Sequence, residues 1–263
     1  GSAPAALQRA VPDRVEQVRI AAVQGNVDQG EKWDEARRER ILGDYVRLSE
    51  EAAERGARWI VWPETAVPGL LDADLGLVTR LARLARRTDA VLVVGGMGVE
   101  LDPTGRRIEA YLDSAFLIGR DGERLGRYDK SHLVPFGEYV PLRDLFGRLF
   151  QSLARGLSPT DVRPGAGPRV MLVPEDGEDA PPVRIGVPIC YELLFPHVVR
   201  RFVAARAGVL LAITNDAWYG RTGAPHQFLA MTALRSAENG RWTVRAANTV
   251  SYTHLRAHET KAN

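Results

Sequence analysis

Short, continuously apolar segments alternate along this chain with longer segments that have helical periodicity. The clearest apolar segments are "AVLVVGG" (90–96), "VRIGVPIC" (183–190) and "VLLAITND" (209–216). The helical segments "PHVVRRFVAARAG" (196–208) and "PHQFLAMTALRSAENG" (225–240) each begin with proline and end at glycine, as helices often do. Strands that read as unbroken apolar runs are buried on both faces. Their alternation with helices predicts an α/β fold built in layers.

The composition indicates a globular chain that can bury a large core. Its 263 residues are 45% apolar, and 35 Lys and Arg residues face 33 Asp and Glu residues. The resulting net charge of +2 predicts no nucleic-acid partner. No apolar run reaches the roughly 20 residues that a membrane-spanning helix needs, and no signal segment opens the chain. We therefore expect this chain, by itself, to be soluble.

We expect one large domain with two irregular ends. Residues 1–13 read as a flexible leader or a cloning remnant, and residues 14–250 as the folded domain. Residues 251–263 are polar and unpatterned, which predicts a disordered tail. Residues 141–182 are rich in Pro, Gly and Arg, a composition that predicts long loops of the kind that often form lids. The other expected elements are strands at 18–27, 58–64, 114–119, 122–130 and 241–248, and helices at 34–56 and 74–87.

Three apolar strands each end in a reactive side chain. "WIVWPE" ends at Glu64, "RLGRYDK" at Lys130 and "RIGVPIC" at Cys190. Because functional groups collect at the carboxyl ends of parallel strands, a carboxylate, an ammonium and a thiol are expected to share one cleft. The carboxylate can take the proton of the thiol, and the ammonium can stabilise the thiolate and an oxyanion.

Each of these residues, taken alone, has an ordinary explanation. A single cysteine such as Cys190 is more often a buried small hydrophobe than a nucleophile. Glu64 can be an exposed turn residue, and Lys130 can be a solvated charge. Lysine, however, occurs only at 32, 130 and 261 in a chain dominated by arginine. The coincidence of all three residues at strand ends favours a shared site.

The same segments resemble those of a known superfamily. "WPET" (62–65), "YDK" (128–130) and "PICYE" (188–192) are similar to the catalytic segments of the nitrilase (carbon–nitrogen hydrolase) superfamily. The resemblance implies a four-layer α-β-β-α sandwich with a Glu–Lys–Cys triad. It makes Glu64 the general base, Lys130 the stabiliser of the oxyanion and Cys190 the nucleophile.

Further segments resemble one branch of that superfamily, the apolipoprotein N-acyltransferase family. The resemblance spans about residues 18–249 and rests on "VQGNVDQGEKWDE" (23–35), "WPETAVPG" (62–69), "LVPFGEYVPLRDLF" (133–146), "CYELLFP" (190–196) and "TNDAWYGRTGAPHQFLAMTALRSAENGR" (214–241). It implies transfer of an acyl chain from a phospholipid, through a thioester on the cysteine, to the α-amino group of an apolipoprotein's diacylglyceryl-cysteine. It implies no metal and no organic cofactor.

The resemblance also implies supporting residues. Glu138 in "PFGEYVP" matches a second glutamate that orients Lys130 or shares in proton transfer. Tyr191 and Glu192 follow the nucleophile as they do in the family, and the backbone N–H of Tyr191 is a candidate oxyanion donor. Trp33 matches a tryptophan near the substrate, although an ordinary core role fits this residue equally well.

Two departures from the family leave alternatives open. Family members are bacterial inner-membrane enzymes whose catalytic domain lies on the periplasmic side, after transmembrane helices that this sequence lacks. The family also continues with further strands where this chain has 251–263, so we expect C-terminal strands to be missing. The alternatives are a soluble amidase of the same superfamily, which transfers the acyl group to water, and an inactive truncated domain.

Overall fold

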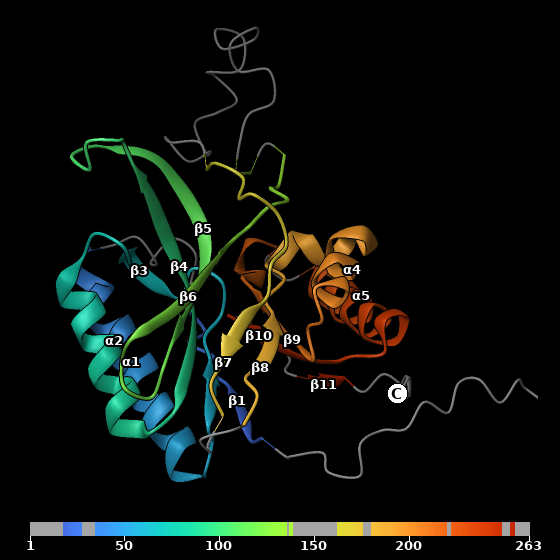
Figure 1. Cartoon of the computed structure of the whole chain (residues 1–263), viewed down its shortest axis with the longest axis horizontal. Coiled ribbons are helices and arrows are strands. Elements are labelled where there is room, and N and C mark those ends of the chain that lie inside the picture. The colour runs from blue at the N-terminus through green and yellow to red at the C-terminus, as the bar shows by residue number, and fades with distance from the viewer. Residues whose placement is uncertain are drawn as a thin grey trace, which may run out of the picture.

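The computed structural model describes residues 18–27, 35–135, 137–138, 162–175, 180–219, 222–248 and 253–255. Two β-sheets lie face to face, and helices cover the outer face of each sheet (Figure 1). This arrangement confirms the expected α-β-β-α sandwich. In the part of the chain that the structure describes, no helix is long and apolar enough to cross a membrane.

The first sheet has six strands and comes from the N-terminal half of the chain. Its order is β1-β2-β4-β5-β6, with β3 paired to β4 beside β2. Its strands are β1 (Ile20–Ala22), β2 (Trp59–Val61), β3 (Val67–Leu70), β4 (Val91–Leu101), β5 (Ile108–Ile118) and β6 (Arg124–Asp129). Strands β1, β2 and β4 are parallel, whereas β5 is antiparallel to both of its neighbours. Two reversals make β6 run in the same direction as β2, so the carboxyl ends of these two strands lie at the same edge.

The second sheet has five strands in the order β11-β10-β9-β8-β7. Its strands are β7 (Met171–Val173), β8 (Val183–Gly186), β9 (Val209–Thr214), β10 (Trp242–Ala247) and β11 (Thr253–Leu255). The three central strands are parallel and the two edge strands are antiparallel to their neighbours. Parallel central strands place the segments after β8 and β9 side by side at one end of this sheet.

Four α-helices form the two outer layers of the described structure. Helices α1 (Glu35–Glu54) and α2 (Leu75–Thr88) pack on the first sheet, and α4 (Pro196–Ala204) and α5 (Ala224–Asn239) pack on the second. Two helix ends agree with the capping residues that the sequence predicts. The Asp74 side chain accepts a hydrogen bond from the N–H of Leu77 at the start of α2. Gly240 adopts a left-handed conformation after α5.

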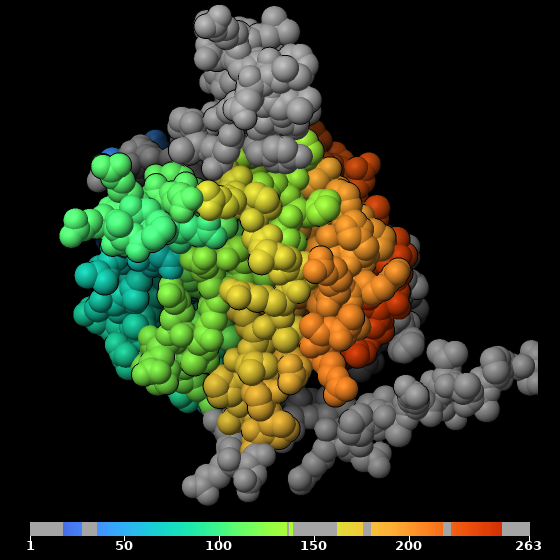
Figure 2. Space-filling model, turned by 45° about the horizontal axis from the view of Figure 1, so that its top comes forward, coloured from blue at the N-terminus to red at the C-terminus, as the bar shows by residue number. Residues whose placement is uncertain are grey.

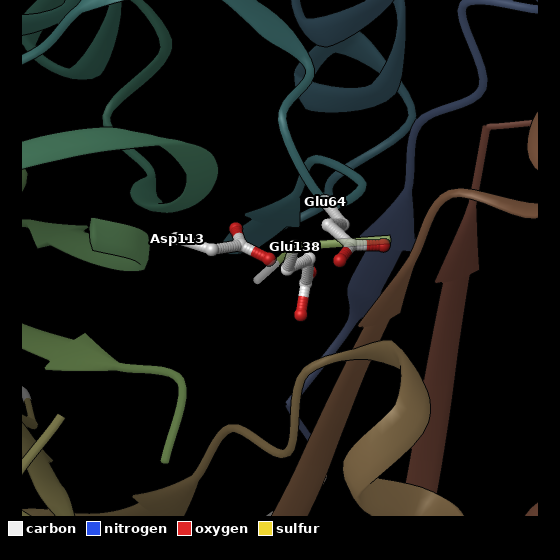
Figure 3. A group of neighbouring side chains, drawn as sticks. All are labelled: Glu64, Asp113 and Glu138. Carbon is white, nitrogen blue, oxygen red and sulfur yellow. The ribbon is translucent and has the colours of Figure 1, made fainter. Parts of the chain in front are cut away.

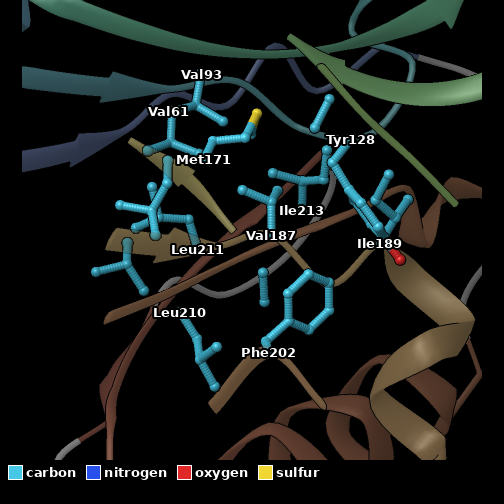
Figure 4. Packing of buried hydrophobic residues seen from close by; sticks show 14 of the residues in the cluster. Val61, Val93, Tyr128, Met171, Val187, Ile189, Phe202, Leu210, Leu211 and Ile213 are labelled. Atoms are coloured by element: carbon cyan, nitrogen blue, oxygen red, sulfur yellow. The ribbon is translucent and has the colours of Figure 1, made fainter. Parts of the chain in front are cut away.

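The hydrophobic core has two layers that follow from this stacking. One cluster lies between the first sheet and α1 and α2, and includes Ile41, Leu81 and Leu92. The larger cluster lies between the two sheets and extends to α4 through Phe202 (Figure 4). Figure 4 shows Val61 of the first sheet and other buried side chains of both sheets meeting in this layer. Burial on both faces explains why the central strands read as unbroken apolar runs.

The structure corrects several expectations. Residues 141–182 were expected to form loops, but Met171–Val173 within them form β7, an edge strand of the second sheet. The tail at 251–263 was expected to lack strands, but Thr253–Leu255 pair with β10 as β11. The strand expected over 183–190 ends at Gly186, four residues before Cys190. Strand β3 was not expected, because "VPGL" contains both proline and glycine. The leader at 1–13 lies outside the described residues.

Residues 162–175 connect the two halves of the chain beside Lys130. In Figure 2, residues coloured yellow, which include 162–175, run between the strands of the first sheet and the second half of the molecule. Within this segment, the N–H of Gly165 donates to the carbonyl of Lys130 at 2.8 Å. Met171 packs against Gly126 of β6. The strand ends of the two sheets are therefore held next to each other.

Replacing Gly95 with alanine is expected to destabilise the fold next to Glu64. A Cβ atom at Gly95 would lie 2.1 Å from the carbonyl oxygen of Pro63 and 2.8 Å from Cα of Glu64, both backbone atoms that cannot rotate away. We expect Gly95→Ala to lower the free energy of unfolding by about 1–3 kcal/mol in denaturant titration.

Gly43 is the matched control, because it lies in α1 and a Cβ there would have no atom within 4 Å. Gly43→Ala is expected to raise the free energy of unfolding by about 0.5–1 kcal/mol through helix propensity. Equal stability of the two variants would show that β4 can move away from the segment after β2.

Candidate active site

Lys130 lies at the centre of a buried cluster of carboxyl groups. Its Nζ donates hydrogen bonds to Oε1 of Glu64 at 2.8 Å, to Oδ2 of Asp113 at 3.2 Å and to Oε1 of Glu138 at 2.5 Å. The lysine side chain is 0% exposed. Figure 3 shows the three carboxyl groups gathered from three separate segments. A buried charge of this kind is stable only when opposite charges surround it.

Burial and the three carboxyl groups act in opposite directions on the lysine. Burial alone disfavours the ammonium, but the neighbouring carboxyl groups, of which Glu64 has the largest effect, outweigh it and raise the pKa of Lys130 well above its usual value. Lys130 therefore carries its positive charge at neutral pH. Oxygen atoms of the three carboxyl groups all lie within 4.8 Å of one another, a spacing that also suits a metal ion. Here the ammonium contacts all three groups.

Glu64 is held in place from two sides. It follows β2 and Pro63, and Thr65 after it adopts a left-handed conformation with φ of 44°. Its Oε1 accepts from Lys130, and its Oε2 accepts from the backbone N–H of Asn215 at 2.7 Å. Asn215 follows β9, so the first sheet supplies the carboxylate and the second sheet supplies its second donor. The glutamate is 4% exposed, and its charge raises the pKa of the Cys190 thiol.

Glu138 joins the cluster from the segment after β6. Its Oε1 accepts from Lys130, and its Oε2 accepts from the N–H of Val134 at 2.7 Å. Burial raises the pKa of Glu138, and the nearby charge of Glu64 adds to this rise, while Lys130 lowers the pKa. The contact with Lys130 is compatible with the expected role of Glu138 in orienting the lysine. The raised pKa of Glu138 is also compatible with the other expected role, proton transfer.

Cys190 lies at the start of a short 3-10 helix, η3 (Cys190–Leu194), and is 4% exposed. Its φ of 46° lies in the left-handed region, which costs a non-glycine residue about 1–3 kcal/mol. Strain of this kind is frequent at active sites and is not needed for core packing. Asn26, Thr65, Asp89 and Arg206 share this left-handed φ, so the conformation supports a functional role for Cys190 only together with the charged cluster that acts on its thiol.

The thiol of Cys190 is protonated at rest. Burial raises its pKa well above the usual value, and the charge of Glu64 raises it further, whereas Lys130 and a hydrogen bond with Thr214 lower it. The thiol therefore needs a base when it reacts. Glu64 is the carboxyl group with the strongest electrostatic influence on this thiol, which makes it the candidate base.

Glu192 connects the segment after β6 to the turn that carries Cys190. Its Oε1 accepts from the hydroxyl of Tyr128 at 2.6 Å, from the N–H and hydroxyl of Ser131 at 2.8 Å, and from the N–H of His132 at 3.2 Å. Its Oε2 accepts from the N–H of Ile189 at 2.9 Å. Glu192 is fully buried. It therefore fixes the position of Cys190 relative to Lys130 and does not contact the reacting atoms.

The structure describes Tyr191 but only part of the loops that the sequence predicts over the site. The ring of Tyr191 packs edge-on against Phe195 with centroids 5.1 Å apart. Its backbone N–H lies in the first turn of η3, where N–H groups have no partner within the helix, which is compatible with the expected oxyanion donor. Trp33 lies outside the described residues, as do residues 141–161 of the expected lid.

Asp113 was not identified from the sequence, although it contacts Lys130 directly. It lies within β5, and the N–H of Lys130 also donates to its carbonyl at 2.8 Å. The available signal was an aspartate inside the otherwise apolar strand "YLDSAFLI". Asn215 was also missed, because its backbone N–H makes the contact and its side chain gives no clue.

Comparisons with known proteins agree on the family. The family described as carbon–nitrogen hydrolase matches residues 19–260, and so extends past residue 249, where we expected the resemblance to end. A curated apolipoprotein N-acyltransferase from Geobacter metallireducens is 40% identical over 240 residues, which are 91% of this chain and 44% of the relative. One from Pseudomonas syringae pv. tomato is 35% identical, covering 88% of this chain and 42% of the relative. The chain thus spans less than half the length of these relatives.

Solved structures share the fold. An amidase from Nesterenkonia sp. AN1, with acrylamide added at its active-site cysteine, matches with a TM-score of 0.62 and 21% identity, covering 92% of this chain and 86% of that one. A carbon–nitrogen hydrolase from Helicobacter pylori G27 matches with a TM-score of 0.58 and 16% identity, covering 80% and 68%.

Replacing Lys130 with methionine is expected to destabilise the protein in a pH-dependent way. Removing one partner of a buried ion pair costs about 3–5 kcal/mol, because the remaining charges are left uncompensated. Burial already raises the pKa values of Asp113 and Glu138, and without the ammonium they rise further, so the folded state binds more protons than the unfolded state. We expect the loss in unfolding free energy to be larger at about pH 8 than at about pH 5, measured by denaturant titration.

Arg80→Met is the control, because Arg80 forms a surface ion pair with Glu39 at 2.6 Å. It is expected to cost about 0–1 kcal/mol at either pH. A Lys130→Met deficit that does not change with pH would contradict the picture of carboxylates held by the ammonium.

Replacing Glu192 with glutamine is expected to loosen the turn at Cys190. The amide oxygen of glutamine can accept from the donors at residues 128–132, but its NH₂ group then faces the N–H of Ile189, and two donors cannot pair. We expect these unpaired donors to lower the free energy of unfolding by about 1–3 kcal/mol. Ser131→Ala removes only one of the donors and is expected to cost less. Denaturant titration measures both variants, and equal losses would show that Glu192 is not the main connection.

Proposed function

Because the chain belongs to the carbon–nitrogen hydrolase family, we propose that it carries the chemistry of an apolipoprotein N-acyltransferase. It transfers an acyl chain from a phospholipid to the α-amino group of the diacylglyceryl-cysteine of an apolipoprotein. The observation that supports the proposal is the buried contact between Glu64 and Lys130, whose charges both act on the thiol of the buried, strained Cys190. The curated relatives of the same name, at 35–40% identity over about nine tenths of the chain, support the choice of reaction.

The first step forms a thioester. Glu64 accepts the proton of the Cys190 thiol as the sulfur attacks the carbonyl carbon of the phospholipid ester. Lys130, whose raised pKa keeps it charged, stabilises the oxyanion together with the backbone N–H of Tyr191. The tetrahedral intermediate collapses, the C–O bond breaks, and the lysophospholipid leaves with the proton that Glu64 returns. The acyl group then remains on sulfur.

The second step uses the same groups in reverse. The α-amino group of the apolipoprotein attacks the thioester, and Glu64 accepts a proton from the amine. Lys130 again stabilises the oxyanion, and the C–S bond breaks. The thiol of Cys190 regains its proton from Glu64, and the product is the N-acylated lipoprotein. The high pKa of the thiol suits this step, because it returns the sulfur to its neutral resting form.

The supporting residues have distinct proposed roles. Glu138 orients Lys130 and is available for proton transfer, since it contacts the ammonium at 2.5 Å. Glu192 fixes the turn of the nucleophile through its contacts with Ser131 and Ile189. Trp33 is assigned to the substrate-binding site from the sequence resemblance alone.

The proposed reaction implies a membrane location. Both the phospholipid donor and the lipid-modified acceptor reside in the bilayer, so the whole protein is assigned to the bacterial inner membrane with this domain on the periplasmic side. This assignment rests on the resemblance and the names of the relatives.

Amide hydrolysis is the second candidate. A structural neighbour is an amidase with an active-site cysteine, and the same three groups would serve if water replaced the amine as acyl acceptor. The first half of the reaction would then act on an amide. The two functions differ in the acyl donor and in the acceptor, and this difference can be measured.

Intact mass spectrometry tests the proposal directly. The chain is incubated with phosphatidylethanolamine in detergent, beside Cys190→Ala and Glu64→Gln. Because Cys190 is the only cysteine, a hydroxylamine-labile acyl adduct in the wild type reports on this residue alone. We expect the adduct in the wild type, none in Cys190→Ala, and a rate lowered by about 100-fold or more in Glu64→Gln.

Other outcomes separate the candidates. Turnover of a simple amide without any adduct from phospholipid would replace the proposal with amide hydrolysis. An adduct that forms equally in Glu64→Gln would contradict the role of Glu64 as the base. Transfer of the acyl group to a synthetic diacylglyceryl-cysteine peptide completes the test of the second step.

A further inference from the structure

Asp113 takes no part in the mechanism above, yet it is buried against the catalytic lysine. It lies on β5 with its side chain 4% exposed, and its Oδ2 accepts from Nζ of Lys130 at 3.2 Å. Its Oδ1 is buried and has no hydrogen-bond partner among the described residues. A buried carboxylate normally accepts several hydrogen bonds, so a single long contact calls for an explanation.

The cluster holds more negative groups than one ammonium can balance. Three carboxyl groups have oxygens within 4.8 Å of one another, and Lys130 is the cation that contacts them. Carboxyl groups this close do not all ionise together in a buried site; one or more of them keeps its proton.

The three groups differ in the donors that support an ionised form. Glu64 accepts from the N–H of Asn215 in addition to Lys130, and Glu138 accepts from the N–H of Val134 in addition to Lys130. Asp113 accepts from the ammonium at the longest of the three distances, and its other polar contact is with the carboxyl group of Glu64, which raises the pKa of Asp113. Hydrogen bonds to the charged form favour ionisation, so Asp113 is the group least able to carry a charge.

We propose that Asp113 is a neutral carboxylic acid in the resting site and acts as a positioning residue for Lys130. Its oxygen directs the ammonium without cancelling the charge, so that charge remains available to the thiolate and the oxyanion. The pKa of Asp113 agrees with this geometry. Burial raises it well above the usual value, and the charges of Glu64 and Glu138 add to the rise, which Lys130 only partly offsets.

The proposal deepens the proposed function, because it takes Cys190 as the nucleophile. When Glu64 accepts the thiol proton, the negative charge moves from Glu64 to sulfur, and the net charge of the site is unchanged. An ionised Asp113 would add a further anion near the new thiolate and oppose its formation. A neutral Asp113 avoids this cost while still holding Lys130 in place.

Infrared difference spectroscopy tests the proton directly. The wild-type protein is expected to show the carbonyl stretch of a protonated carboxylic acid at neutral pH, and Asp113→Asn is expected to lose this band. The measurement does not depend on any acyl substrate, so it can succeed or fail separately from the proposed function. A spectrum in which Asp113→Asn leaves every carboxylic acid band in place would overturn the proposal.

Alkylation of Cys190 by iodoacetamide tests the electrostatic consequence. Because the chain contains one cysteine, the mass gain reports only on Cys190. Asp113→Asn replaces one neutral group with another, so the rate is expected to stay within about threefold of wild type from pH 6 to pH 9. If Asp113 were ionised, its loss would lower the thiol pKa and raise the rate at neutral pH by about tenfold per pKa unit, which would contradict the proposal.

Two further variants make the result interpretable. Glu138→Gln removes a charge that raises the thiol pKa without removing the proposed base, and is expected to speed alkylation, which shows that the assay detects a lost anion. Asp113→Ala removes the oxygen that contacts Lys130, and is expected to lower kcat for thioester formation with KM little changed, whereas Asp113→Asn restores it. Equal loss in the alanine and asparagine variants, with both folded by near-UV circular dichroism, would show that a charged carboxylate is required.

Discussion

The buried ammonium of Lys130 is the interaction on which the rest of the site depends. It binds Glu64 after β2, Asp113 within β5 and Glu138 after β6, at distances of 2.5–3.2 Å. A charge with 0% exposed side chain persists only if all these segments stay in place. The antiparallel pairing of β5 and β6 makes this possible, because it brings the backbone of Lys130 against that of Asp113.

Hydrogen bonds between the two sheets are the second interaction on which the site depends. Glu192 carries hydrogen bonds from Ser131 on one side and Ile189 on the other, and the N–H of Asn215 reaches across to Glu64. These contacts hold Cys190 in a left-handed conformation that it would not adopt alone. Stabilisation of the large core between the sheets offsets the strain at the cysteine. Reactivity and stability therefore depend on the same interface.

Charge balance connects this architecture to chemistry. The thiol of Cys190 has a raised pKa, so it is protonated at rest, while the raised pKa of Lys130 keeps that residue charged; in the proposed mechanism, Glu64 accepts the thiol proton. In the proposed function, this site forms a thioester with the acyl donor. An amidase of 21% identity shares the fold, and relatives named as apolipoprotein N-acyltransferases share the sequence, so the acyl acceptor is the point that experiment has to decide.

The sequence alone determined the layered α/β fold, because apolar periodicity and its interruption are local signals. It also singled out Glu64, Lys130 and Cys190, but Cys190 begins η3 four residues after β8 and does not end a strand. It also carried the resemblance that singled out Glu138 and Glu192. Only the tertiary structure revealed that Asp113 contacts Lys130 and that Asn215 supports Glu64. It also showed that Thr253–Leu255 extend the second sheet as β11, where a disordered tail was expected. These features depend on pairing between residues far apart in the chain, and a backbone N–H or a buried carboxyl group leaves no periodic trace in the sequence.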